Sequence, residues 1–418
     1  MKLSNFGTLF SDKAGIVQLM DDLGAAMAVD RDMLMLGGGN PGRIPEVEAL
    51  FRRRMQAILD EGDEFERLIG NYDPPQGDPR FVAALAALLS REYGWAIGPE
   101  NVAVTNGSQS ASFILFNMFA GPSPDGINRR ILLPLTPEYI GYADQGLGPD
   151  FFVANRPNIE QLDDRFFKYH VDFDSLTVGD DVGAICVSRP TNPTGNVLTD
   201  DEVRKLGALA RRHDVPFILD GAYGTPFPHI VFSQATPVWD DNTILCLSLS
   251  KLGLPGARSG IVVAREEVIK ALYGINAIVN LTTGGFGAAL ALDMVESGDI
   301  IRVSRELVCP FYRAKAEQAV GWFRRELGNY AYRIHKPEGA LFLWLWFPSL
   351  PITSGELYSR LKARGVLVIP GHHFFPGLPG EWRHRHECIR VTYSQSADVV
   401  ERGVAIIADE VKRAYDAA

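Results

Sequence analysis

Helical and strand-like stretches alternate along most of this 418-residue chain, and this alternation limits the fold more than any other feature. Residues 131–135, 184–188 and 216–219 are short apolar runs typical of buried strands, whereas residues 200–213 have helical character. A strand–helix–strand repeat of this kind predicts a mostly parallel sheet covered by helices, here over about residues 47–300.

The last part of the chain has a different pattern. A charged amphipathic stretch from about residue 300 to 327 predicts one long helix. Residues 328–418 then predict a separate α+β unit, with strands near 332–334, 341–347, 365–369 and 389–393 and a final helix at 396–416.

A lysine follows one of the predicted core strands. Residues 244–247 are apolar, Ser248, Ser250 and Lys251 come next, and Arg258 follows seven residues after the lysine. A desolvated amine near a cationic group has a lowered pKa and is a nucleophile for an aldehyde. The hydroxyls and the arginine suit a phosphate, and pyridoxal 5′-phosphate (PLP) carries both groups. A surface lysine at a strand end is the alternative.

An acidic residue ends another predicted strand. Asp220 follows residues 216–219, and Tyr223 comes three residues later. Open α/β sheets place ligand contacts at the carboxyl ends of their strands. PLP withdraws electrons only while its ring nitrogen stays protonated, which requires a carboxylate partner such as Asp220. Tyr223 would hydrogen-bond the phenolic oxygen of the ring; the alternative is a helix-capping aspartate with a turn tyrosine.

The strand predicted at 184–188 breaks into a loop with two prolines and a glycine. Asn192 stands between Thr191 and Pro193, so its backbone is restrained and its amide is presented rigidly. The alternative is an ordinary β-turn, which such clusters usually form.

Three segments share a regular spacing: Asn-Pro-Thr-Gly (192–195), Asp-x-x-Tyr (220–223) and Ser-x-Ser-Lys (248–251), each about 28 residues after the last. In this order they resemble the core signature of the aspartate aminotransferase family of PLP enzymes, fold type I. The resemblance implies an α/β large domain, with a mostly parallel seven-stranded sheet between helices, and a smaller α+β domain. The implied division is an N-terminal segment belonging to the small domain (1–46), the large PLP-binding domain (47–300), and an interdomain helix with the C-terminal small domain (301–418).

A phosphate site is expected where the strand 102–104 meets an apolar helix. Gly107, Ser108 and Gln109 lie at this junction. Free N–H groups and the helix dipole favour an anion at a helix N-terminus. The same segment resembles the phosphate site of the family.

Three further residues match family motifs. Tyr139 resembles the aromatic residue that stacks on the PLP ring, and Tyr72 the tyrosine that reaches the phosphate of the neighbouring subunit. Arg390 resembles the arginine that binds the substrate α-carboxylate. The resemblance therefore implies a homodimer with shared active sites.

The family also implies a role for each residue of the core signature. Lys251 would carry PLP and move a proton between the substrate α-carbon and the cofactor. Asp220 would keep the ring nitrogen protonated, and Tyr223 and Asn192 would tune the phenolic oxygen. Asn192 would also assist Arg390 on the carboxylate. One departure from many members is that the loop between Lys251 and Arg258 is one residue shorter.

Five blocks, at 37–42, 137–144, 251–256, 335–340 and 370–377, resemble a narrower group within the family. That group implies the reaction of L-valine with pyruvate to give 3-methyl-2-oxobutanoate and L-alanine, with Gly39 contacting the substrate.

Several alternative functions stay open. Another amino-acid aminotransferase, or a carbon–sulfur β-lyase of the same fold, would carry the same core residues. A transcription regulator with an aminotransferase-like domain, or a non-catalytic PLP-binding protein, is a more distant alternative.

Composition excludes other classes. Apolar residues make up 46% and charged residues 22% of the chain, which is ordinary for a globular enzyme. The net charge of −10 argues against a nucleic-acid partner. Four scattered cysteines predict free thiols in a reducing compartment. The N-terminus lacks a signal-peptide pattern, and the most apolar run, 341–347, is far shorter than a membrane span, so a cytoplasmic protein without a membrane partner is expected.

Two motifs suggest other ligands but are weak. Residues 37–42 satisfy the G-x-G-x-x-G pattern of dinucleotide sites, but nearby prolines break the turn-to-helix that such a site requires. Histidines at 372–373 and 384–386, near Cys388, are too close in sequence to converge on one metal from a regular element, and no Cys-x-x-Cys pair supports them. No metal site is therefore expected.

Overall fold

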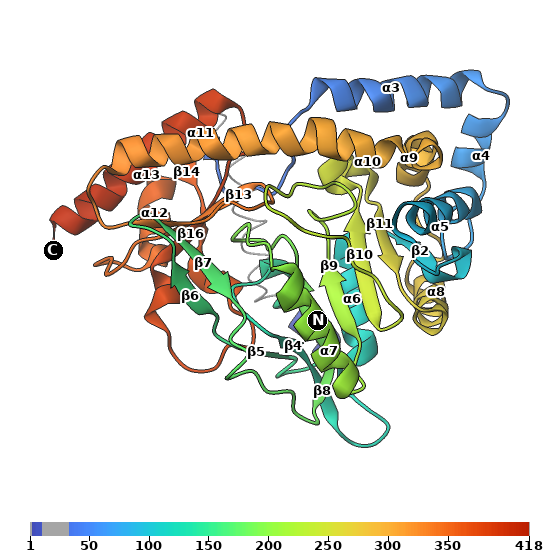
Figure 1. Cartoon of the computed structure of the whole chain (residues 1–418), viewed down its shortest axis with the longest axis horizontal. Coiled ribbons are helices and arrows are strands. Elements are labelled where there is room, and N and C mark those ends of the chain that lie inside the picture. Colours follow the sequence, from blue (N-terminus) through green and yellow to red (C-terminus); the bar gives the residue numbers. More distant parts are fainter. Residues whose placement is uncertain (1, 11–32, 418) are drawn as a thin grey trace.

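The computed structural model describes residues 2–10 and 33–417. Within these residues the chain forms two large sheets with helices around them, and a separate pair of short strands (Figure 1). None of the described helices is both long and apolar enough to cross a membrane.

The first sheet has the strand order β2–β11–β10–β9–β8–β4–β3, with β5 also paired to β4. It is mostly parallel: β11 runs antiparallel to both of its neighbours, and the two-residue β3 runs antiparallel to β4. Without β3 the sheet has seven strands, so the prediction of a mostly parallel seven-stranded sheet is confirmed. The strands are β2 (Val102–Thr105), β3 (Gly121–Pro122), β4 (Asn128–Leu133), β5 (Phe152–Ala154), β8 (Val182–Ser188), β9 (Phe217–Asp220), β10 (Thr243–Ser248) and β11 (Gly260–Val263).

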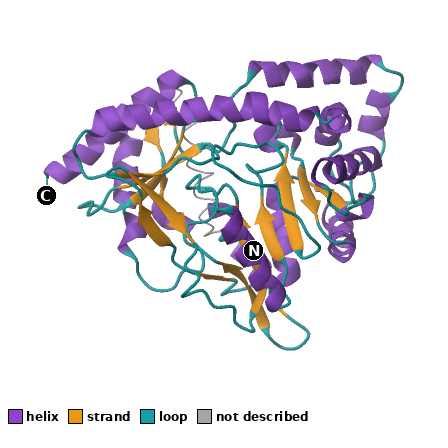
Figure 2. Cartoon of the chain, viewed as in Figure 1, coloured by secondary structure: helices purple, strands orange, loops and turns teal. Residues whose placement is uncertain are grey.

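Helices cover both faces of this sheet (Figure 2), and β8 shows why. Every residue of β8 is buried, as expected for a strand between two layers. Ala184 and Cys186 belong to a core with α6 (Ser108–Phe119) and α8 (Glu266–Asn280). The alternating Ile185 and Val187 face the other way, into a core with α5 (Pro79–Tyr93) and α7 (Asp200–Arg212).

The helix α7 begins at a capping box. The hydroxyl of Thr199 accepts a hydrogen bond from the Glu202 backbone N–H at 3.1 Å, and the Glu202 carboxylate accepts one from the Thr199 N–H at 2.8 Å. This satisfies two N–H groups that a helix N-terminus otherwise leaves unpaired. The predicted helix at 200–213 is confirmed to within one residue.

The second sheet has the strand order β15–β16–β13–β12–β7–β6. β12 and β7 are parallel, and the other neighbours are antiparallel. Its strands are β6 (Asn158–Gln161), β7 (Phe166–His170), β12 (Arg333–His335), β13 (Phe342–Trp346), β15 (Ile369–Pro370) and β16 (Cys388–Thr392).

The β6–β7 hairpin was not predicted, although it comes from the middle of the chain. It lies within the span 47–300 but pairs with β12 through Phe166 and Ile334, 168 positions apart in the numbering (334 minus 166). Nothing local in the sequence indicates so distant a partner. The division of the chain at residues 46 and 300 stays a prediction.

The beginning of the described main body lies beside the C-terminal region. β1 (Leu34–Met35) pairs in parallel with β14 (Val366–Leu367). The backbone oxygen of Leu36 accepts a hydrogen bond from the Thr392 N–H at 2.8 Å. This pairing carries the glycine-rich segment 37–42 to the space between the two sheets.

The predicted long helix at 300–327 is a run of three pieces. α10 (Asp299–Val303) continues through a π-helical turn at Ser304–Val308 into α11 (Cys309–Leu327). Pro310 has no N–H to donate, which is one reason for irregular bonding in the turn before it. Figure 1 shows α10 and α11 running along one side of the molecule past both sheets.

The other described helices complete the layers around the sheets. They are α1 (Asn5–Leu9), α3 (Pro45–Asp60), α4 (Glu64–Gly70), α9 (Phe286–Ser297), α12 (Ser354–Ala363) and α13 (Ala397–Asp416).

Candidate active site

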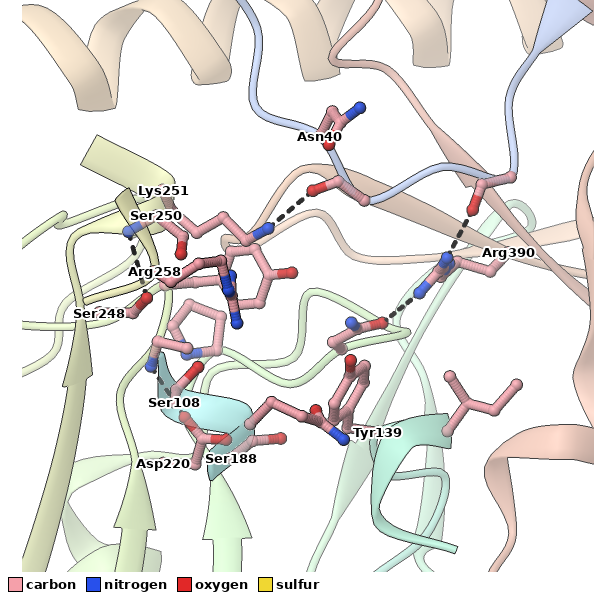
Figure 3. A pocket seen from close by; sticks show the side chains of 18 residues that line it. Asn40, Ser108, Tyr139, Ser188, Asp220, Ser248, Ser250, Lys251, Arg258 and Arg390 are labelled. Atoms are coloured by element: carbon pink, nitrogen blue, oxygen red, sulfur yellow. Dashed lines mark hydrogen bonds between the residues drawn. The ribbon is translucent and has the colours of Figure 1, made fainter. Parts of the chain in front are cut away.

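A cavity of about 330 Å³ opens at the carboxyl edge of the first sheet. Ser188, Asp220 and Ser248, the last residues of β8, β9 and β10, all line it. These strands are neighbours in the sheet, so their ends meet at one place. Figure 3 shows Lys251 and Arg258 toward one end of the cavity and Arg390 toward the other.

Most of the predicted site residues converge here. Those that line the cavity are Gly39, Ser108, Gln109, Tyr139, Asn192, Asp220, Tyr223, Ser248, Ser250, Lys251, Arg258 and Arg390. Gly107 does not line it but lies against Arg258. Tyr72 is not among the lining residues and is 81% exposed.

Lys251 sits in a short 3₁₀ turn directly after β10. Its Nζ donates a hydrogen bond to the backbone oxygen of Gly39 at 2.7 Å and lies 5.4 Å from the centre of the Tyr223 ring. Desolvation, followed by the positive charges of Arg390 and Arg258, lowers the pKa of the Lys251 amine from 10.5 to about 8. The neutral, nucleophilic form of this amine is therefore far more populated near neutral pH than that of an ordinary lysine, although it remains the minor form.

Asp220 is held by two donors. The hydroxyl of Tyr142 donates to its Oδ2 at 2.5 Å, and the backbone N–H of Ala222 donates to its Oδ1 at 2.9 Å. Burial raises the pKa of the Asp220 carboxyl, although both hydrogen bonds oppose the rise. A cationic group in the cavity beside this carboxylate would be strongly favoured, since opposite charges stabilise each other at low dielectric.

Several groups that favour an anion lie at the Lys251 end of the cavity. Gly107 has φ +87°, and a Cβ there would lie 2.3 Å from Nη2 of Arg258. The helix α6 begins at Ser108, so its free N–H groups open beside this guanidinium. Ser248 and Ser250 add hydroxyls. The shorter loop after Lys251 thus still places Arg258 beside Gly107 and the start of α6.

A buried guanidinium lies at the opposite end of the cavity. Arg390 on β16 is 3% exposed. Its Nη1 donates to Oδ1 of Asn192 and its Nη2 to the backbone oxygen of Gly37, each at 2.7 Å. The guanidinium lies 4.1 Å from the centre of the Phe342 ring. Burial lowers the pKa of Arg390 to about 10, but the side chain stays cationic at neutral pH.

Sequence reasoning missed two carboxyl–hydroxyl contacts behind the cavity. One is the bond from Tyr142 to Asp220. The other joins Glu138 to Ser188, whose backbone N–H donates to Oε1 at 2.8 Å and whose hydroxyl donates to Oε2. Burial raises the pKa of Glu138 to about 8. Both lie in the block 137–144, but only the packing of that block against β8 and β9 identifies their partners.

The sequence pattern of the family described as aminotransferase class I and II matches residues 158–407. Valine–pyruvate aminotransferase of Escherichia coli strain K12 is 50% identical over 415 residues, which cover 99% of both chains. This chain therefore belongs to the class I and II aminotransferases.

Two solved structures are close to this fold. A putative amino-acid aminotransferase from Psychrobacter arcticum 273-4 matches with a TM-score of 0.98 and 46% identity over 100% of both chains. Valine-pyruvate aminotransferase from Salmonella typhimurium LT2 matches with a TM-score of 0.89 and 49% identity, over 97% of this chain and 100% of that one.

Proposed function

We propose that this protein is a PLP-dependent aminotransferase that exchanges an amino group between L-valine and pyruvate. The products are 3-methyl-2-oxobutanoate and L-alanine. The observation that carries the proposal is the single cavity that joins a nucleophilic lysine, a buried carboxylate, an anion site and a buried arginine. The half-identical relative from Escherichia coli, which carries that name, supports the choice of substrates.

The residues present fit PLP in this cavity. The Gly107 backbone leaves the space beside Arg258 that a Cβ would fill, which suits a phosphate. Asp220 would hold the protonated ring nitrogen, Tyr223 and Asn192 would contact the phenolic oxygen, and Tyr139 would stack on the ring. When bound, PLP supplies an aldehyde that takes up the amino group and a ring that withdraws electrons from the α-carbon.

Lys251 is the proposed proton carrier. Its amine would hold the cofactor, and its Nζ would take the proton from the substrate α-carbon and return one during the second half of the cycle. A pKa of about 8 suits both directions, because the group is readily protonated and deprotonated near neutral pH.

Arg390 and Asn192 are the proposed carboxylate site. The guanidinium offers paired N–H donors to a carboxylate, which fixes the orientation of the α-carbon. Among the described lining residues the cations are Lys251, Arg258 and Arg390, and each already has a role. A substrate side-chain carboxylate would stay unpaired, so small apolar amino acids and their 2-oxo acids are the proposed substrates.

We further propose a homodimer in which Tyr72 reaches the phosphate site of the partner. Tyr72 is exposed in the monomer, and so are several apolar side chains on elements at the same end of the molecule (Figure 1). Clusters of exposed apolar residues mark protein interfaces. The residues are Ile69, Tyr72, Tyr273, Ile278, Val279, Leu281 and Phe286.

The proposed compartment is the cytoplasm. Cys186, Cys246, Cys309 and Cys388 are all free and buried. Free thiols are the rule in reducing compartments.

A single-turnover panel tests the substrate proposal. Holoenzyme is mixed with one amino acid at a time, and conversion of the PLP form to the pyridoxamine form is followed by absorbance. Alanine and valine should react fastest, leucine and 2-aminobutyrate more slowly, and aspartate and glutamate slowest. One methylene in an apolar pocket changes the barrier by only about 1–3 kcal/mol. If aspartate or an aromatic amino acid reacts fastest, the valine–pyruvate assignment fails. Ammonia release without an acceptor would indicate a β-lyase instead.

A further inference from the structure

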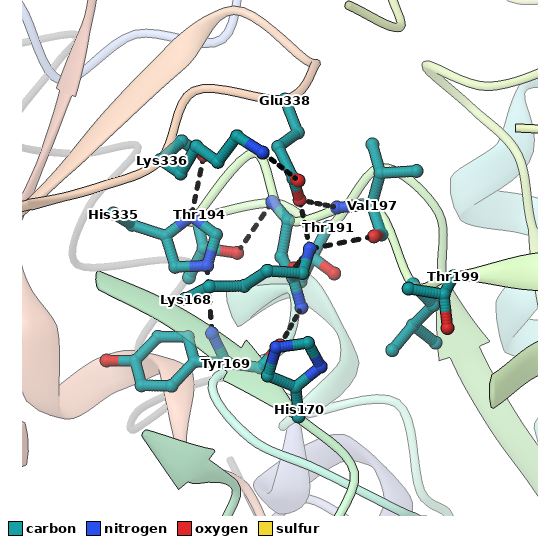
Figure 4. A network of polar contacts seen from close by, with 12 residues as sticks. Lys168, Tyr169, His170, Thr191, Thr194, Val197, Thr199, His335, Lys336 and Glu338 are labelled. Carbon is teal, nitrogen blue, oxygen red and sulfur yellow. Dashed lines mark hydrogen bonds and ion pairs between the residues drawn. The ribbon is translucent and has the colours of Figure 1, made fainter. Parts of the chain in front are cut away.

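A buried ion pair lies outside the cavity, where the second sheet meets the loop that carries Asn192 (Figure 4). Lys168 on β7 is 6% exposed and Glu338, in the connection from β12 to β13, is 4% exposed. The Nζ of Lys168 bonds Oε2 of Glu338. Burying two charges is costly, and an apolar pair of similar volume is often as stable, so stability alone does not explain this pair.

Three further bonds of the pair bind the Asn192 loop, while Oε1 of Glu338 lies 3.4 Å from Nζ of Lys336. Lys168 Nζ also donates to Oδ1 of Asn196 at 2.9 Å and to the backbone oxygen of Val197 at 3.0 Å. Glu338 Oε2 accepts from the Val197 N–H at 3.1 Å. Each charge of the pair thus contacts the loop directly, and all three donors of the ammonium group are used.

The loop transmits this attachment to Asn192 through a closed turn. The Thr191 N–H donates to the Asn196 oxygen, and the Gly195 N–H to the Thr191 oxygen, each at 2.8 Å. At Gly195 (φ +69°) a Cβ would lie 2.6 Å from the Gly339 oxygen, so the turn packs tightly against the segment after Glu338. Asn192 lies inside this turn and cannot shift independently of Asn196.

The same segment also contacts the Tyr223 loop. The Phe232 N–H donates to the Glu338 oxygen at 2.6 Å, and the Ala340 N–H donates to the Ile230 oxygen at 3.0 Å. The Ile230 N–H in turn donates to the Tyr223 oxygen at 2.9 Å. Residues 338–340 therefore lie between two loops of the first sheet that both line the cavity.

The geometry makes the relative position of the two sheets decisive for the carboxylate site. Arg390 and Lys168 belong to the second sheet, and Glu338 to the connection between two of its strands. Asn192 belongs to a loop of the first sheet. Their 2.7 Å contact requires that loop to be held at one place on the second sheet.

We propose that the Lys168–Glu338 pair is a positioning element of the active site, which holds the Asn192 turn where it meets Arg390 and so sets the affinity for the substrate carboxylate. The inference rests on the proposed role of Arg390. It adds two residues that touch neither substrate nor cofactor and that act through Asn192.

The test measures binding of isovalerate, which has the carboxylate and carbon skeleton of valine but no amino group. Holoenzyme with Glu338→Gln is compared with the wild type by isothermal titration calorimetry. Because the substitution weakens a charge-assisted contact, the dissociation constant should rise about tenfold. KM for pyruvate should rise by a similar factor, with a smaller fall in kcat.

A matched control separates positioning from loss of stability. Glu410 on α13 is also a buried glutamate in an ion pair, with Arg364 at 3.1 Å, and lies outside the cavity lining. Glu410→Gln should lower Tm to a similar extent but leave isovalerate binding within about twofold of the wild type, since it contacts no cavity loop.

A double variant covers the case in which Glu338→Gln does not fold. Lys168→Met with Glu338→Met removes both charges and should raise Tm above that of Glu338→Gln, because no buried charge is left unpaired. It should still bind isovalerate about tenfold more weakly, because Asn196 and Val197 have lost their partners. Affinity within twofold of the wild type in either charge variant would overturn the inference. Failure of the proposed reaction would appear instead as absent valine turnover in the wild type.

Discussion

The two ends of the cavity are built differently. At the cofactor end, Asp220 ends one strand of the first sheet and Lys251 follows the strand beside it. At the substrate end, Arg390 comes from the second sheet and Gly37 from the start of the described main body. In the proposed mechanism, covalent and proton chemistry thus rests on one sheet, whereas carboxylate recognition depends on how separate elements meet. Changes at the first end should lower kcat, and changes at the second should raise KM.

The largest effect is expected from Lys251→Ala at the cofactor end. Without the amine, turnover of valine with pyruvate should fall by several orders of magnitude, because both the covalent attachment and the proton carrier are lost. PLP should still bind through its phosphate contacts. Steady-state kinetics and PLP content after dialysis provide the measurement. Turnover near the wild-type rate would remove Lys251 from the mechanism.

Asp220→Ala should be the next most severe change. The ring nitrogen would lose its carboxylate partner, so α-proton removal should slow by about 10²–10³-fold, the range typical of a lost electrostatic contact in a transition state. KM should change little. The test is the single-turnover rate with valine and with α-deuterated valine. An unchanged rate and isotope effect would contradict this role.

At the substrate end, Arg390→Gln should act mainly on KM. Loss of a charge-assisted contact costs about 1.5–3 kcal/mol, which corresponds to a rise in KM of roughly 10- to 150-fold for both substrates. The measurement is KM and kcat for valine and for pyruvate. A large fall in kcat with KM unchanged would break the proposed division between the two ends.

Tyr72 tests whether the cofactor end is completed by a second subunit. Tyr72→Phe should weaken PLP binding by about tenfold, the value of one bond to a charged phosphate. Mixing Tyr72→Phe with Lys251→Ala subunits should create one wild-type site per heterodimer, measured as activity and PLP affinity after exchange. Activity that never exceeds that of the Tyr72→Phe homodimer would show that the site is not shared.

The smallest expected effect is a shift in the pH dependence of PLP binding. This shift links the two ends of the cavity, because Arg390 at one end influences the pKa of Lys251 at the other. The neutral Lys251 amine is the reactive form, so the rate at which apoenzyme binds PLP should rise with pH. Because the pKa of Lys251 is lowered from 10.5 to about 8, this rate should level off above about pH 8. Arg390→Gln removes a positive charge that disfavours the protonated amine, so the midpoint should move upward. Absorbance stopped-flow from neutral to alkaline pH measures both. An unchanged midpoint of the pH profile would show that the charge of Arg390 does not affect the pKa of Lys251.

The sequence predicted the cofactor end far better than the substrate contacts. β8, β9 and β10 were expected from apolar runs, and Asn192, Asp220 and Lys251 from the polar residues that follow them. Both signals are local, because a buried strand needs apolar residues and a loop needs Gly and Pro. Family resemblance indicated Arg390, but nothing predicted the bond to Gly37, 353 residues away.

The sequence by itself indicated the core strands β8, β9 and β10 and the helix α7, and which polar residues stand at the ends of those strands. Only the tertiary structure decided that the β6–β7 hairpin joins the second sheet, that Tyr142 meets Asp220, and that Lys168 pairs with Glu338. The physical reason is the range of the interactions. Periodicity and turn chemistry act over a few residues, whereas these contacts join side chains 78 and 170 residues apart, and packing of whole layers brings them together.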